Sequence, residues 1–445
     1  MPKKDSGINL EFAFYQYLRN FYLENQHEIR RHLYQETKRF LDFNNPENGN
    51  AYLRLPQYEA LEMYIFIKEI LDNAPVYQIF DDWFAEKNKF KDRGHYGTLF
   101  GEIDKDQYKA IFERMKDFAR GYPNYIFALT MGTGKTILMA TCIFYEFILA
   151  NRHIEDKRFC HNALVFAPDK TVLQSLKEIQ DFDKSKVVPK EYVNKLNENL
   201  RFQFLDDVGA ALNIIDKTRY NIIISNTQKI ILKRQHKTKN AVTKLYDSSI
   251  RIFDANSVYE KNKDLYNVDD ENELLENQRF TKLTRIEQLG IYVDEAHHAF
   301  GNNLSKDLGQ EDKRTSLRLT IDELSERLKE LGTQVVACYN YTGTPYVGNQ
   351  VLPEVVYAYS LYEAIQKNFL KKVTIHDYKN TKNLAFVRSV LTDFWKNHKG
   401  KRYENMLPKI AFFASTIEEL EKELKPNIEK AMQELKIKDD RLLVN

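Results

Sequence analysis

One stretch limits what this chain can fold into more than any other: residues 129–136 have the sequence Leu-Thr-Met-Gly-Thr-Gly-Lys-Thr. An apolar run at 125–128 precedes it, and a helical pattern at 137–149 follows it. Strand, glycine turn and helix in this order form a phosphate-binding loop, because glycines let successive backbone N–H groups point at an anion and the helix adds its positive N-terminal end. The sequence therefore predicts a nucleotide site at this turn.

Two side chains of the loop have expected roles in binding ATP and Mg²⁺. Lys135 stands where the lysine of such a loop reaches the β- and γ-phosphates, and the hydroxyl of Thr136 stands where it would ligate magnesium. The backbone cradle for the phosphates is expected to consist of Met131, Gly132, Thr133 and Gly134. The general pattern G-x-x-x-x-G-K-[ST] has glycine where this chain has Leu129, so the match is not strict.

Composition narrows the class of protein. The 445 residues, 43% of them apolar, suffice for two or three domains. Lysine and arginine number 66 against 64 aspartates and glutamates, so any nucleic-acid surface must be local. The three cysteines lie far apart and form no C-x-x-C pair, which is typical of a reducing cytosol. The sequence shows neither a signal peptide nor a membrane span, and we expect a cytoplasmic protein that does not bind membranes.

Short apolar strands alternate with helical patterns after the loop. Such strands are typical of a parallel sheet that is covered by helices on both faces. The strands expected downstream of the loop are residues 163–168, 202–205, 221–225, 290–293 and 334–341. The sequence therefore predicts an α/β fold for the middle of the chain.

The rest of the chain divides around this sheet. Apolar residues recur three and four apart over 10–41 and 56–71, which predicts helices. A strand at 409–414 and a helix at 416–435 open a second α/β unit. The expected domains are a helical N-terminal accessory region at 1–105, an ATP-binding lobe at 106–350 with an insertion at about 229–289, a helical connector at 351–372 and an incomplete second lobe at 373–445.

A second motif, Asp-Glu-Ala-His, follows the buried strand that ends at Val293. In a nucleotide triphosphatase Asp294 would hold the magnesium that bridges the β- and γ-phosphates, and Glu295 would orient and deprotonate the attacking water. His297 would sense the γ-phosphate region. Adjacent carboxylates at the carboxyl end of a strand lie where an α/β sheet presents its ligand-binding groups.

A third motif, Thr-Gly-Thr-Pro at 342–345, again follows an apolar strand. The order and spacing of G-T-G-K-T, D-E-A-H and T-G-T-P resemble the superfamily 2 helicases and translocases. The aromatic-rich helical start, the Leu-Tyr-Glu-Ala-Ile stretch at 361–365 and Lys-Lys-Val at 371–373 are similar to the restriction subunits of type III restriction enzymes. Those subunits often carry Asp-Glu-Pro-His where this chain has Asp-Glu-Ala-His.

The resemblance implies a RecA-like lobe and further site residues. Thr342 and Thr344 match the motif that couples hydrolysis to DNA movement. The positions that match the family's contacts to the nucleic-acid backbone include Pro168, Lys170, Thr171, Asn226 and Thr227. A glutamine upstream of the loop reads adenine in this superfamily, and two candidates remain open. Gln107 has the better spacing, whereas Gln57 has the better local pattern.

The function that the resemblance implies is an ATP-dependent DNA helicase or translocase of a type III-like restriction or phage-defence system, with a modification methyltransferase as a partner. The family's arginine fingers match no motif here, so we expect a C-terminally truncated chain with poor turnover. We also see no nuclease signature. Two alternatives remain: a nucleotide-dependent DNA-binding switch without turnover, and an RNA helicase of the same superfamily.

Overall fold

The computed structural model describes residues 13–84, 105–167, 170–204, 219–226, 280, 282–296, 317–347, 350–371, 383–402 and 405–437. The chain divides into two compact units, Met1–Leu370 and Lys371–Asn445, which are described separately. Among the residues that the structure describes, no helix combines the length and the apolarity needed to cross a bilayer.

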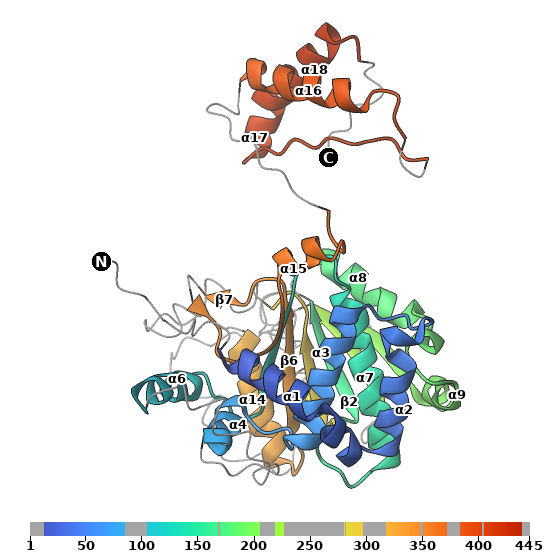
Figure 1. The fold of residues 1–445 in the computed structure, drawn as a ribbon, viewed down its shortest axis with the longest axis vertical. Coiled ribbons are helices and arrows are strands. Elements are labelled where there is room, and N and C mark those ends of the chain that lie inside the picture. Colours follow the sequence, from blue (N-terminus) through green and yellow to red (C-terminus); the bar gives the residue numbers. More distant parts are fainter. Residues whose placement is uncertain are drawn as a thin grey trace, which may run out of the picture. The chain divides into compact units, whose positions relative to one another are not determined.

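Unit 1 is built around a parallel sheet of seven strands in the order β3-β4-β2-β5-β6-β1-β9. Figure 1 shows helices packed around this sheet. Its strands are β1 (Asn124–Leu129), β2 (Asn162–Ala167), β3 (Arg201–Phe204), β4 (Asn221–Asn226), β5 (Leu289–Val293), β6 (Val335–Thr342) and β9 (Val355–Tyr359). Every pairing in this sheet is parallel. All carboxyl ends therefore meet at one edge, and the five strands expected between the phosphate loop and residue 341 are confirmed.

Helices cover both faces of the sheet, because successive side chains of a strand point to opposite sides. In β2, Ala163 and Val165 belong to one buried cluster, while Leu164 and Phe166 belong to another. The first cluster includes α7 (Lys135–Arg152), α8 (Lys170–Asp181) and α9 (Lys190–Asn199). The second includes α14 (Leu317–Glu330). The core thus lies in two layers, one on each side of the sheet.

The N-terminal helices form part of the first layer and share its core. They are α1 (Ala13–His32), α2 (Gln35–Asn44), α3 (Leu55–Ile65) with its π-helical continuation η2 (Phe66–Ile70), and α4 (Val76–Phe84). Short 3₁₀ turns lie at η1 (Pro46–Asn48) and η4 (Lys184–Lys186), and α6 (Lys105–Asp117) precedes β1. The helix expected over 10–41 is confirmed as helical but is divided into α1 and α2. Tyr34 is extended and donates its N–H to a Glu69 oxygen at 2.8 Å, which separates α1 from α2.

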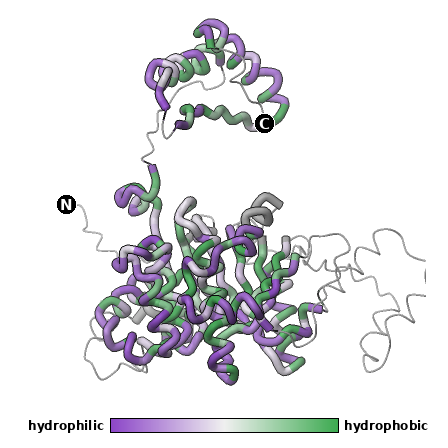
Figure 2. Tube along the Cα trace, turned by 90° about the vertical axis from the view of Figure 1, so that its right-hand side faces the viewer, coloured by the Kyte–Doolittle hydropathy of each residue, from purple (hydrophilic) through white to green (hydrophobic). Residues whose placement is uncertain are grey.

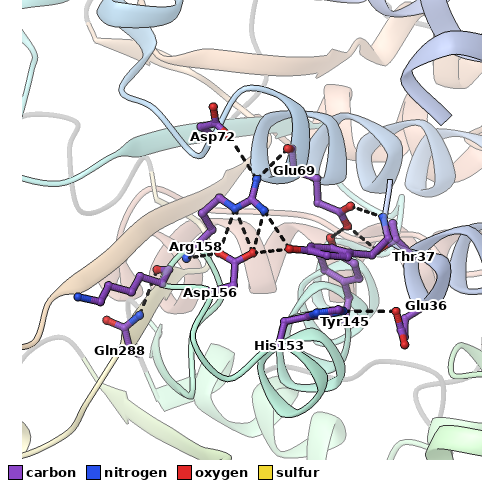
Figure 3. Close-up of polar contacts among 11 residues, drawn as sticks. Glu36, Thr37, Glu69, Asp72, Tyr145, His153, Asp156, Arg158 and Gln288 are labelled. Carbon is purple, nitrogen blue, oxygen red and sulfur yellow. Dashed lines mark hydrogen bonds and ion pairs between the residues drawn. The ribbon is translucent and has the colours of Figure 1, made fainter. Parts of the chain in front are cut away.

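A loop between α7 and β2 ties these helices to the opposite, amino-terminal edge of the sheet (Figure 3). Its Arg158 donates to the Asp156 carboxylate at 2.7 Å and to the Glu69 carbonyl at 2.9 Å. The same guanidinium contacts Asp72 at 3.2 Å. Nearby, the Tyr145 hydroxyl of α7 donates to Glu69 Oε1 at 2.5 Å. The partly buried Arg158 therefore joins this loop to the end of η2 (Phe66–Ile70) and the turn after it.

The connector expected to be helical over 351–372 is wrong in its first half. Residues Val355–Tyr359 form β9, which pairs in parallel with β1 at the sheet edge. Their β-branched and aromatic side chains favour a strand. The helix α15 (Leu361–Gln366) follows, and a small antiparallel hairpin of β7 (Tyr346–Val347) and β8 (Gln350–Val351) precedes β9.

Unit 2 has a small core of its own. It contains α16 (Leu384–His398), α17 (Ile417–Glu419), the π-helical η6 (Leu420–Leu424) and α18 (Lys425–Glu434). Hydrophobic and hydrophilic residues are interspersed along the helices of this unit in Figure 2. The strand expected at 409–414 is wrong, since no described segment of this unit pairs with it. Ile410 and Phe412 pack on the core, whereas Phe413 is 91% exposed.

Candidate nucleotide-binding site

The predicted phosphate loop lies between the end of β1 at Leu129 and the start of α7 at Lys135. Gly132 and Gly134 have φ angles of 77° and 82°, in the left-handed region that glycine adopts without strain. The Thr133 hydroxyl donates to the Thr130 carbonyl at 2.7 Å and holds the turn from within. The local sequence therefore forms the strand, turn and helix that a phosphate site requires.

Gln57 from the start of α3 lies directly against this loop. Its Nε2 donates to the Gly134 carbonyl at 3.0 Å, and its Oε1 accepts from the Arg54 N–H at 2.9 Å. The side chain is buried. The structure thus brings Gln57 to the phosphate loop across 77 residues of sequence. Gln107 lies in α6, but its side chain is outside the described residues.

The two adjacent carboxylates follow β5 at the same sheet edge. Lys135 Nζ forms an ion pair with Glu295 Oε1 at 3.0 Å. Glu295 has a φ of 46°, and its N–H donates to Asp294 Oδ1 at 3.0 Å. The Asp294 N–H in turn donates to the Phe166 carbonyl of β2 at 3.0 Å. The structure therefore brings the loop lysine and both predicted carboxylates together.

Asp294 lies in a poorly solvated place, with 5% of its surface exposed. Its pKa is raised to about 6, first by burial and then by the neighbouring charge of Glu295, against the opposing charge of Lys135. Burial disfavours a carboxylate that lacks a cation of its own. The Asp294 carboxyl is therefore mostly ionised at neutral pH and binds a proton near and below pH 6, where a bound cation would displace that proton.

The Thr-Gly-Thr-Pro motif ends β6, the strand between β1 and β5. The Thr344 N–H donates to Thr342 Oγ1 at 3.1 Å. A Cβ on Gly343 would lie 3.7 Å from the backbone nitrogen of Met131, so this motif lies beside the phosphate loop. The Ala296 N–H donates to the Tyr341 carbonyl at 3.0 Å and joins the ends of β5 and β6. All three motifs thus meet at one edge.

The oxygen ligands expected from Thr136 and Asp294 fit magnesium better than a metal ion that requires four or more ligands from the protein. Within the described parts of the chain, no group of three or more His, Cys, Asp or Glu side chains could hold a metal ion. Magnesium takes oxygen ligands and is held through one or two protein groups together with substrate phosphates and water. The hydroxyl of Thr136 and the carboxylate of Asp294 belong to this class of ligand.

Several predicted site residues cannot be placed by their side chains. His297, Pro168 and Thr227 lie outside the described residues. Lys170 and Thr171 start α8 after β2. Asn226 ends β4. The backbones of Lys170, Thr171 and Asn226 therefore lie at the carboxyl edge of the sheet. The role of the predicted contact residues in binding nucleic acid remains a prediction.

The sequence did not predict that three residues far downstream, Tyr359, Phe369 and Leu370, lie against the phosphate loop or beside it. A Cβ on Gly132 would lie 3.1 Å from Leu370 Cδ2. The Arg54 guanidinium lies 5.8 Å from the ring centroid of Phe369. The Thr130 N–H donates to the Tyr359 carbonyl of β9 at 3.3 Å. The apolar pattern of β9 was the one available signal, because it predicts a strand that could flank β1.

Comparisons with known proteins agree with the motifs. Residues 101–321 match the family model of the type III restriction enzyme res subunit. The resemblance to superfamily 2 helicases and to these subunits is thereby confirmed over these residues, and it supports a helicase-family function. The chain is also similar to the DUF1998 helicase MrfA in its crystal structure, with 14% identity and a TM-score of 0.34, over 81% of this chain and 42% of that chain. This chain thus spans less than half of MrfA. A search of curated proteins finds no match.

Proposed function

We propose that this protein binds ATP with Mg²⁺ and hydrolyses it to drive movement along DNA, as part of a type III-like restriction or phage-defence system. One observation carries the proposal: Lys135 of the phosphate loop forms an ion pair with Glu295, 160 positions further along the sequence, and Asp294 lies beside Glu295. The family match over 101–321 supports the helicase class. A modification methyltransferase is the proposed partner.

The chain's own groups would divide the work of phosphoryl transfer. The loop N–H groups and Lys135 would hold the phosphates, and Thr136 and Asp294 would hold magnesium, which neutralises charge that develops on the phosphates. Glu295 would accept the proton of the attacking water. In the structure Glu295 is paired with Lys135 at 3.0 Å, so a γ-phosphate that takes the lysine would also release the base.

Gln57 is the proposed reader of the adenine base. Its amide uses one donor on the Gly134 carbonyl and one acceptor lone pair on the Arg54 N–H. A glutamine amide has a second N–H and a second lone pair. These match N7 and the N6 amine of adenine, whereas guanine presents an acceptor in place of that amine.

The proposal is tested by steady-state ATP hydrolysis, measured without nucleic acid, with duplex DNA and with duplex RNA. Glu295→Gln keeps the shape and removes the base, so it should lower turnover by about 100-fold or more and leave ATP binding nearly intact. Glu323→Gln changes an exposed carboxylate on α14 and is the matched control. Turnover that survives in Glu295→Gln would exclude Glu295 as the base.

The Lys135–Glu295 ion pair also favours a second candidate, a switch that binds ATP and DNA without turnover, because the pair holds the base away from water. Such a switch would bind DNA more tightly with ATP and release no phosphate in any of the three conditions. Stimulation by RNA alone would instead indicate an RNA helicase.

A further inference from the structure

A lysine and a glutamate form an ion pair in the deepest part of unit 1. Lys68 Nζ lies 2.8 Å from Glu146 Oε1, and their side chains are 1% and 0% exposed. Lys68 also donates to the Tyr339 hydroxyl at 2.6 Å. Glu146 Oε2 accepts from the Cys160 N–H at 2.8 Å. Both charges are therefore paired and hydrogen-bonded, as buried charges must be.

The pair joins two helices that meet a second time at the candidate nucleotide site. Lys68 lies in η2, which continues α3, and Glu146 lies in α7. At the other end of α3, Gln57 donates to Gly134, which immediately precedes α7. The contact of residue 57 with residue 134 and that of residue 68 with residue 146 run in the same direction along both segments. The segment formed by α3 and η2 therefore lies parallel to α7 and is joined to it at two points.

Neighbouring groups reinforce the inner end of this arrangement. The Tyr64 hydroxyl of α3 donates to Glu146 Oε1 at 2.5 Å. Next to the ion pair, the Tyr145 hydroxyl donates to Glu69, as Figure 3 shows. Tyr64 also lies 3.2 Å from the Tyr292 hydroxyl of β5, two residues before Asp294. The cluster around Lys68 and Glu146 therefore contacts β5, the strand that immediately precedes the predicted magnesium ligand Asp294.

Stability alone does not explain such a pair. Replacing a buried ion pair with well-packed apolar residues is often neutral or stabilising, because the cost of desolvating the charges offsets their attraction. A charged pair nevertheless has one correct alignment, whereas apolar surfaces tolerate sliding. A slip of α3 by one turn, about 5.4 Å, would take Gln57 out of hydrogen-bonding range of Gly134.

We propose that Lys68 and Glu146 are positioning residues that fix the register of α3 on α7 and thereby present Gln57 to the adenine base. This inference rests on the proposed function, since it assigns the source of base specificity at the same site. In this proposal, the buried ion pair at the end of η2, which continues α3, contributes to the preference for ATP over GTP.

The test compares the affinities of the magnesium complexes of ATP and GTP in the full chain by isothermal titration calorimetry, with unfolding in urea as a separate readout. Lys68→Met and Gln57→Ala should both lower the ratio of ATP to GTP affinity, by about tenfold. Arg318→Met is the matched control, because Arg318 is a buried cation paired with Glu354 at 3.4 Å, and its helix α14 packs on the opposite face of the sheet from α3. It should lower stability and leave the ratio unchanged.

Tyr64→Phe provides a milder variant that removes one hydroxyl from the cluster, and it should lower the ratio in the same direction if Lys68→Met does not fold. The inference is overturned if Gln57→Ala lowers the ratio while Lys68→Met or, failing that, Tyr64→Phe keeps the wild-type value. An unchanged ratio of ATP to GTP affinity in Gln57→Ala would also overturn the inference, because Gln57 would then not read the adenine base. Wild-type protein that binds neither nucleotide would instead refute the proposed function.

Discussion

At the scale of single residues, the candidate site depends on charges held where water is scarce. Asp294 is buried and has a pKa raised to about 6, while Glu295 beside it is paired with Lys135. Two carboxylates of one motif thus have different surroundings, which suits different roles. A bound cation would stabilise the charged form of the buried Asp294 carboxyl. Glu295 would become free to accept a proton once Lys135 moved from it to a phosphate.

The pKa of Asp294 predicts how nucleotide binding depends on pH. The protonated carboxyl cannot ligate magnesium, so affinity for magnesium ATP should be constant well above pH 6 and fall by up to about tenfold per pH unit below it. Calorimetry in buffers of different ionisation enthalpy should show proton release on binding near pH 6. Asp294→Asn is the control, because its remaining pH dependence belongs to the nucleotide. An identical dependence in wild type and Asp294→Asn would contradict this account.

A second residue-scale prediction concerns Gly134, whose φ is 82°. A Cβ there would lie 2.5 Å from Gln57 Nε2, whereas a Cβ on Gly332, with φ 78°, would meet nothing within 4 Å. Both alanine substitutions should cost about 1–2 kcal/mol of unfolding free energy through left-handed backbone strain. Gly134→Ala should also displace Gln57 and weaken ATP binding. Equal ATP affinities in the two variants, measured by calorimetry, would argue against this role of Gln57.

Single residues also show where sequence reasoning reaches its limit. The roles of Lys135, Asp294 and Glu295 follow from short motifs, because each motif carries its own local geometry. The local pattern around Gln57 made it a candidate for the glutamine that reads adenine beside Gln107, but it gave no sign of the contact with Gly134. Leu370 over Gly132 had no local signal, because the contact depends on how the chain returns after β9.

At the scale of elements, the N-terminal helices belong to the core of unit 1. Phe21 of α1 is 1% exposed, and its ring centroid lies 4.8 Å from that of Trp83 and 5.9 Å from that of Phe66. Helical periodicity predicted these helices but could not show what they cover. An amphipathic face indicates that a partner exists and does not identify it.

Two substitutions on α1 test this packing. Phe21→Ala should lower the unfolding free energy of unit 1 by about 3–5 kcal/mol, since it empties a buried aromatic site. Leu23→Ala, at a position 51% exposed on the same helix, should change it by less than about 0.5 kcal/mol. Urea unfolding followed by circular dichroism gives both values. Similar small effects would mean that α1 does not contribute to the core.

The strand expected at 409–414 failed for a reason that applies to any such pattern. Alternating apolar residues describe which sides of a segment can be buried, and Ile410 and Phe412 do pack on the core of unit 2. A strand also requires a neighbouring backbone to pair with. The helices of unit 2 have no unpaired backbone groups along their sides that a strand could bond to. Among the described residues, the segment 409–414 therefore forms no strand.

At the scale of the whole molecule, strand order explains how motifs far apart in sequence form one site. β6 lies between β1 and β5, so the phosphate loop, the threonine motif and the two carboxylates follow three adjacent strands. The alternation of short apolar strands with helical segments predicted the parallel sheet. It could not give the strand order, which depends on contacts between β1 and segments more than 200 residues downstream.

The most direct measurement of the central claim is calorimetric binding of magnesium ATP to the full chain and to Lys135→Ala, with Lys195→Ala as the control for loss of an exposed lysine on α9. Lost charge-assisted contacts to phosphate are worth about 1.5–3 kcal/mol each, so Lys135→Ala should bind about 10- to 100-fold more weakly than wild type. Lys195→Ala should bind like wild type. Equal affinities for wild type and Lys135→Ala would contradict the assignment of this loop as a nucleotide site.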